Sequence, residues 1–199
     1  MSLSLKLIHK TFVLQHDQSD CGVACLLSLV QYYGGAHTLE ELRSLSGTTV
    51  QGTTLLGLYQ AANSIGFEAE GNEANIEVLK AYNAPLILHL TMGNLEHYVV
   101  CYGFEKGMFI IGDPAKGIIR LSAEELDSLW LSKTCLTLTP TPQFKKKTIQ
   151  QKAQFKWFLN LVQKDIRLLV ISALLGVVIS ILGLAMAIFS QKLIDNILP

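Results

Sequence analysis

The hydrophobic pattern separates a mixed N-terminal region from one long apolar segment near the C-terminus. Residues 168–189, LLVISALLGVVISILGLAMAIF, contain no charged side chain. As a helix rising ~1.5 Å per residue, this segment would extend ~33 Å, enough to cross a hydrocarbon core about 30 Å thick. A helix buried in a soluble core is the alternative, but such helices rarely run so long without a polar face. The pattern therefore predicts one transmembrane helix over residues 166–190, with a truncated continuation over 191–199.

Helical spacing dominates the first part of the mixed region. A helix is predicted over about residues 21–33, with Ser19 or Asp20 as its N-cap. Two further helices are expected to begin near Thr38 and Thr54, because each threonine precedes apolar residues at helical spacing. The N-terminal half of the region is therefore predicted to be largely helical.

Short β-rich runs follow Pro85. In chain order they are LILHL, HYVVCYGF, MFII, GIIRL and CLTLT. Turn residues separate these runs, and one capped helix, SAEELDSLW, interrupts the series. Helices first and antiparallel strands second predict an α+β domain over residues 1–140.

Charge is distributed unevenly, although the whole chain has a formal net charge of zero. Residues 1–140 contain 8 Lys or Arg and 14 Asp or Glu, a balance of −6, whereas residues 141–167 contain 7 and 1, a balance of +6. We therefore expect a basic linker or interfacial helix over residues 141–165, between the acidic domain and the apolar helix. Zero net charge argues against nucleic acid as a partner, because binding it depends on neutralising phosphates.

Basic side chains gather on one side of the apolar segment. Those before it are Lys145, Lys146, Lys147, Lys152, Lys156, Lys164 and Arg167. Only Lys192 follows it, so the positive-inside bias predicts that the N-terminal domain faces the cytoplasm. That reducing compartment argues against a disulfide framework among the four cysteines. Cys21 and Cys25 lie one helical turn apart, but no second His or Cys pair at ligand spacing accompanies them, and no metal is expected.

The segment QHDQSDCGVACLL, residues 15–27, carries the first candidate for chemistry. Cys21 stands at the predicted start of a helix, where the positive end of the dipole favours the thiolate. A small buried residue is the alternative for a single cysteine. A thiol nucleophile needs a base, and the base needs an orienting group.

His97 and Asp113 are the candidates for those two roles. His97 opens a predicted strand, and Asp113 follows it by sixteen residues, after the next strand. Two antiparallel strands joined by a turn would place the two side chains beside each other. There are two alternatives. His97 could be a structural residue whose hydrogen bonds are satisfied within an apolar strand, and Asp113 could belong to an ordinary Asp-Pro turn. Gln15, six residues before Cys21, could supply its amide to an oxyanion hole with the Cys21 N–H, or it could be a solvated residue ahead of a helix.

The pattern QxxxxxCGxAC, then HYVV, then GDP resembles the bacteriocin-processing cysteine peptidase domain of peptidase-containing ABC transporters. The resemblance extends over residues from about 10 to 199, including the apolar span and the ending FSQKLIDNILP. It implies a papain-like fold followed by the first transmembrane helix of an exporter. It also implies that Cys21 is the nucleophile, His97 the general base, Asp113 the orienting acid and Gln15 the oxyanion-hole donor.

The same resemblance implies cleavage of a leader peptide after a double glycine, coupled to export of the cargo. The expected partners are the leader-peptide precursor, the membrane and a second copy in the dimer of the full exporter. The expected location is the bacterial inner membrane, with the peptidase facing the cytoplasm. No GxxxxGK[ST] motif occurs, so no cofactor is expected in this chain, and ATP is implied only for the missing exporter part.

The chain is accordingly expected to be the N-terminal portion of a larger exporter. Two alternatives remain open from the sequence. One is a catalytically silent module that docks the leader peptide. The other is a membrane-anchored redox or metal protein that uses Cys21 and Cys25.

Overall fold

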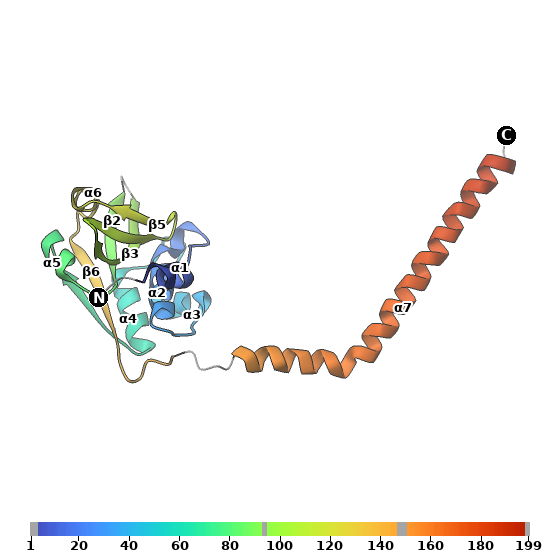
Figure 1. Cartoon of the computed structure of the whole chain (residues 1–199), viewed down its shortest axis with the longest axis horizontal. Coiled ribbons are helices and arrows are strands. Elements are labelled where there is room, and N and C mark those ends of the chain that lie inside the picture. The colour runs from blue at the N-terminus through green and yellow to red at the C-terminus, as the bar shows by residue number, and fades with distance from the viewer. Residues whose placement is uncertain (1–3, 93–94, 147–150, 198–199) are drawn as a thin grey trace. The chain divides into compact units, whose positions relative to one another are not determined.

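The computed structural model describes residues 4–92, 95–146 and 151–197. The chain divides into two compact units, Met1–Lys147 and Thr148–Pro199 (Figure 1). The N-terminal unit contains the α+β fold, and the second unit contains a single long helix.

The described part of the N-terminal unit contains helices and one antiparallel sheet (Figure 1). The helices are α1 (Leu5–Thr11), the 3-10 turn η1 (Gln18–Asp20), α2 (Cys21–Tyr32), α3 (Leu39–Ser46), α4 (Leu55–Ser64), α5 (Ile76–Ala81) and α6 (Ala123–Leu129). The strands are β1 (Phe67–Glu73), β2 (Leu86–Met92), β3 (Leu95–Glu105), β4 (Met108–Asp113), β5 (Gly117–Leu121) and β6 (Thr134–Pro140). Their order across the sheet is β1-β6-β2-β3-β4-β5, and each neighbouring pair is antiparallel.

The structure confirms the predicted helices and corrects one of their caps. Thr38 and Thr54 cap α3 and α4 through side-chain hydrogen bonds to the backbone N–H groups of Glu41 and Gly57. Asp20 occupies the N-cap position of α2 but makes no side-chain cap hydrogen bond. Because η1 runs directly into α2, Asp20 keeps a helical backbone conformation, whereas a capping residue is normally extended.

Four elements have no counterpart among the predictions: the 3-10 turn η1, the strand β1 and the short helices α1 and α5. The two helices span 7 and 6 residues, too short for a clear helical period. Strand β1 is an edge strand that buries only Phe67 and Ala69, so its apolar pattern is weak.

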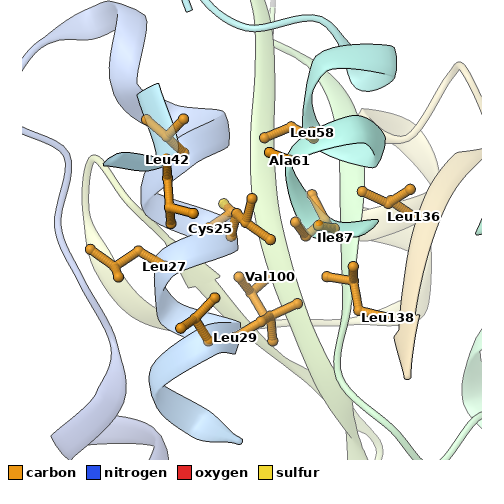
Figure 2. Close-up of a cluster of buried hydrophobic side chains, with 14 of the residues drawn as sticks. Cys25, Leu27, Leu29, Leu42, Leu58, Ala61, Ile87, Val100, Leu136 and Leu138 are labelled. Atoms are coloured by element: carbon orange, nitrogen blue, oxygen red, sulfur yellow. The ribbon is translucent and has the colours of Figure 1, made fainter. Parts of the chain in front are cut away.

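Two hydrophobic clusters cover the two faces of the sheet. Helices α1 to α4 pack on one face, and α5 and α6 pack on the other. Neighbouring residues of β2 divide between them, since Ile87 joins the first cluster and Leu88 the second. Figure 2 shows the first cluster, in which Cys25 and Leu29 of α2 lie near Val100 of β3. Burial on both faces explains why the central strands have almost continuous apolar sequences.

The six residues after β6, 141–146, pack against the same unit. The Thr141 N–H donates to the Gly66 carbonyl oxygen over 3.0 Å, and the Phe144 ring lies 4.4 Å from that of Phe67, centroid to centroid. Gly66 has a φ of +94°, and a Cβ there would lie 2.6 Å from the Phe144 nitrogen. This segment begins the stretch that was expected to be a linker, and it contributes Phe144 to the first cluster.

The second unit is helix α7, Gln151–Ile197. Within it, Ile166–Leu193 is long and apolar enough to cross a membrane by length and composition, with a mean hydropathy of 2.8. This stretch overlaps the predicted span. Lys147 and the side chains of Lys152, Lys156 and Lys164, on which the predicted orientation partly rests, lie outside what the structure describes.

Candidate active site

Cys21 is the first residue of α2 and is buried at the junction of that helix with β3 and α4. The following residue explains how the junction closes. A Cβ on Gly22 would lie 3.2 Å from Leu58 Cδ1 and 3.2 Å from Tyr98 Cδ2, tighter than normal packing. Glycine at this position therefore lets α4 and β3 approach the start of the helix and surround the thiol.

His97 and Asp113 meet at the adjoining ends of β3 and β4. His97 Nε2 lies 2.8 Å from Asp113 Oδ1. The same carboxylate oxygen accepts a hydrogen bond of 2.9 Å from the Ala115 backbone N–H, and the Asp113 side chain is completely buried. Two donors on one buried oxygen hold the carboxylate in place.

The strand pairing that produces this contact is less regular than the sequence suggested. Gly112 pairs with Val100, and the register between β3 and β4 shifts between Cys101 and Gly103. Asp113 therefore reaches His97 diagonally rather than from directly across the ladder. The one signal for this irregularity in the sequence is Gly103, an isolated glycine within β3, which has a φ of +138°.

Hydrogen bonding connects the thiol to this pair. Burial alone would raise the pKa of Cys21, but hydrogen bonding to His97 and to the Tyr98 backbone N–H brings that pKa below its ordinary value of 9.0. Because Nε2 of His97 faces Asp113, Nδ1 is the ring nitrogen left for the thiol. Cys21, His97 and Asp113 thus form one connected chain of side chains.

Opposing effects also set the protonation of His97 and Asp113. Burial alone would lower the pKa of His97, but hydrogen bonds to Asp113 and Cys21 and the charges of both raise it to about 9. Burial alone would raise the pKa of Asp113, yet the hydrogen bonds from His97 and Ala115 bring it below its ordinary value. These directions stabilise the charged forms of all three groups, the thiolate, the imidazolium and the carboxylate, compared with ordinary exposed side chains.

Gln15, His97 and Asp113 line a cleft of about 260 Å³. The Gln15 backbone N–H donates to the Pro114 carbonyl oxygen over 3.0 Å, which ties Gln15 to the residue after Asp113. Its side-chain Oε1 is buried and, among the described residues, accepts no hydrogen bond. The remaining residues lining the cleft are Gln18, Leu95, Glu96, Ala115 and Lys116.

Sequence reasoning missed the charged residues at the cleft. Lys116 Nζ lies 3.6 Å from Asp113 Oδ2, but the lysine side chain is 60% exposed, so solvent screens the attraction. Glu96 pairs with His89 over 2.9 Å. Among the described interactions, His89 contacts none of Cys21, His97 and Asp113. Neither residue belongs to a recognisable pattern, because the fold alone brings them to the cleft.

The other candidate residues lie apart from this site. Cys25 is fully buried and contributes to the first hydrophobic cluster (Figure 2). His9 and His16 are exposed. The His37 side chain is 19% accessible and pairs with Glu41 over 2.9 Å. Within the described residues, no group of three His, Cys, Asp or Glu side chains could hold a metal ion.

Comparisons with known proteins identify the class of this fold and site. Residues 9–143 match the Peptidase C39 family, and the chain belongs to this family. The peptidase domain of Streptococcus ComA, a bi-functional ABC transporter involved in a quorum sensing pathway, is 39% identical, with a TM-score of 0.61 over 65% of this chain and 97% of that one. Family membership and this structure confirm the predicted resemblance and the α+β fold.

Two further relatives describe the context of such domains. A double glycine motif protease from an AMS/PCAT transporter, solved in complex with its leader peptide, is 34% identical, with a TM-score of 0.60 over 65% of this chain and 90% of that one. The lactococcin-G-processing and transport ATP-binding protein LagD of Lactococcus lactis subsp. lactis is 33% identical over 194 residues, 96% of this chain. The chain spans only 26% of the length of that relative.

Proposed function

We propose that this chain is a cysteine peptidase that cleaves the leader of bacteriocin-like precursor peptides after a double glycine. The observation that carries the proposal is the contact of His97 with Asp113 at 2.8 Å, together with the interaction of His97 with the Cys21 thiol that lowers the pKa of the thiol. Membership of the Peptidase C39 family supports peptidase activity in general. Similarity to a double glycine motif protease solved with its leader peptide supports this class of substrate.

In the proposed reaction, Cys21 attacks the carbonyl carbon of the second glycine. The sequence suggested that His97 removes the thiol proton during attack. The lowered pKa of Cys21 and the raised pKa of His97 support this transfer, which leaves a thiolate for the attack and an imidazolium for the next step.

Attack forms a tetrahedral intermediate whose oxygen is negative. Gln15 and the Cys21 backbone N–H are the proposed donors to this oxyanion, and one such donor is worth about 3–4 kcal/mol in the transition state. His97 gives its proton to the leaving amine as the peptide C–N bond breaks. A water molecule then attacks the thioester, His97 accepts a proton from that water, and Cys21 leaves as the thiolate.

Asp113 acts on His97 rather than on substrate. Its carboxylate accepts the Nε2 hydrogen bond, which orients the ring with Nδ1 toward Cys21 and stabilises the imidazolium. Complete burial of the Asp113 side chain strengthens this effect, because water does not screen the charge.

The proposed context is the N-terminal portion of an ABC exporter in the bacterial inner membrane. The apolar stretch Ile166–Leu193 supports attachment to a membrane, and the basic residues before it support a cytoplasmic peptidase. The transport ATP-binding relatives support export of the processed peptide. A dimer of the full exporter is part of the same proposal. ATP would act only in the remaining exporter part.

The test uses the full chain in detergent with a synthetic precursor that carries a double-glycine leader. Cys21→Ala is expected to abolish cleavage, followed by mass spectrometry, while leader binding persists. Cys25→Ala is the matched control on the same helix and should retain cleavage, because Cys25 lies in the core. Undiminished cleavage by Cys21→Ala would refute the proposal. Leader binding without turnover by the unmodified chain would identify a silent docking module instead.

A further inference from the structure

The segment from Gln15 to Cys21 carries two of the groups on which the proposed reaction depends. Its first residue is held by the hydrogen bond from the Gln15 N–H to the Pro114 carbonyl oxygen. Its other end is held by an ion pair. Asp20, directly before Cys21, is completely buried, and its carboxylate faces Arg43 of α3.

The Arg43 guanidinium contacts this carboxylate with two nitrogens. Nε donates to Asp20 Oδ1 over 2.7 Å, and Nη2 donates to Asp20 Oδ2 over 2.5 Å. Such paired contacts fix both the distance and the plane of the carboxylate, which a single point charge does not do. The orientation of Asp20 is therefore set by α3.

The same guanidinium reaches the start of the turn before Asp20. Arg43 Nη2 also lies 3.3 Å from Asp17 Oδ2, and Asp17 Oδ1 accepts hydrogen bonds from the Ser19 N–H and hydroxyl. Asp17 and Asp20 are the two ends of the capping box around η1. The Arg43 side chain of α3 thus contacts the carboxylates at both ends of the turn that leads into Cys21.

We propose that Arg43 is a positioning residue that holds Cys21 and Gln15 in register with His97 and Asp113. This proposal rests on the proposed function, because the positions of Cys21 and Gln15 matter only for the reaction that these residues carry out. Among the described hydrogen bonds and ion pairs, Arg43 contacts Asp17 and Asp20 but neither Cys21 nor His97, so it acts through Asp20. The absence of a side-chain cap on α2 fits this role, since the Asp20 carboxylate is committed to Arg43 instead.

A purely stabilising ion pair is the alternative, and chemistry at Cys21 distinguishes the two. Arg43→Lys keeps the positive charge but loses the planar pair of donors. The titratable groups that act on or respond to Cys21 are His97 and Tyr98 of β3, Asp113 of β4 and Cys25 of α2, and this substitution changes none of them. A change in thiol reactivity would therefore report a change in position.

The experiment measures alkylation of the full chain by iodoacetamide from pH 5 to 10, together with kcat and KM for leader cleavage. Cys25, Cys101 and Cys135 are 0%, 1% and 2% exposed, and burial raises the pKa of each thiol. Cys21 is 6% exposed and its pKa is lowered, so alkylation of the folded protein reports Cys21. Arg43→Lys should lower kcat by roughly 10- to 100-fold with KM unchanged, as expected for displaced reacting groups. Its alkylation midpoint should move up toward that of an ordinary thiol. Arg120→Lys, an exposed residue of β5, is the matched control and should behave as the unmodified chain.

A second variant distinguishes a displacement of Cys21 from the destabilisation that an imperfectly paired buried charge would cause. Asp20→Asn combined with Arg43→Gln removes both charges and leaves no buried charge unpaired, because the Asp17 carboxylate, which also loses Arg43, is 61% exposed. It should show the same loss of kcat and the same shift of the alkylation midpoint. If both variants keep the unmodified kcat and alkylation profile and only unfold at lower temperature, Arg43 is structural and the proposal is wrong. If the unmodified chain cleaves no leader, the proposed function fails, and the alkylation profiles alone still decide the role of Arg43.

Discussion

Replacing Asp113 by Asn tests the electrostatic reasoning behind the triad most directly. The pKa of His97 is raised from 6.5 to about 9, and the hydrogen bond to Asp113 is the largest of the effects that raise it. A shift of that size corresponds to about 3 kcal/mol of preference for the imidazolium. The His97 side chain is only 13% exposed, so little of this preference is lost to solvent screening.

Asn retains a side-chain oxygen at the same place but removes the negative charge. The pKa of His97 should therefore fall from about 9 toward its ordinary value. A histidine is protonated below its pKa, so the upper pH limit of the imidazolium moves down. Near neutral pH fewer molecules then contain the thiolate–imidazolium pair, and the pKa of Cys21 rises in response.

The assay is the pH profile of kcat/KM for leader cleavage, with iodoacetamide alkylation as an independent measure of the thiolate. The unmodified chain should lose cleavage as pH rises through about 9, because the leaving amine then finds no proton on His97. Asp113→Asn should lower kcat/KM by roughly 10²- to 10⁴-fold at neutral pH. It should also shift the loss of cleavage at high pH to a lower pH. Asp127→Asn, whose carboxylate is exposed and pairs with Lys133, is the matched control. If Asp113→Asn still loses cleavage only near pH 9, the reasoning is refuted.

Two other substitutions test separate features of the molecule. Gln15→Ala should lower kcat for cleavage by roughly 10²- to 10³-fold and leave alkylation of Cys21 unchanged, because alkylation creates no oxyanion; an equal fall in both rates would contradict its role. Phe144→Ala should destabilise the N-terminal unit by about 3–5 kcal/mol through loss of a buried ring against Phe67, measured by thermal unfolding of the full chain followed by near-ultraviolet circular dichroism. An unchanged unfolding temperature would show that the segment 141–146 does not support the core.

Much of the fold was predictable because its signals are local. The helices that begin after Thr38 and Thr54 depend on caps, and these helices and α2 depend on the spacing of apolar residues within a few positions. The strands after Pro85 are apolar because both faces of the central sheet are covered. Strand β1 escaped prediction because it is an edge strand with few buried residues.

The sequence by itself determined which side chains could perform the chemistry. Cys21 at a helix start, His97 at a strand start and Asp113 beside a proline are recognisable from residue type and spacing. Only the tertiary structure decided how they meet. The bulge in β3 sets the diagonal contact of His97 with Asp113, and burial together with hydrogen bonding sets the pKa of the thiol. Arg43 stands 22 residues from Cys21 in the sequence. Its hydrogen bonds to Asp20 form only because α3 packs beside the start of α2. Contacts between distant segments depend on packing of the whole domain, and no local pattern encodes them.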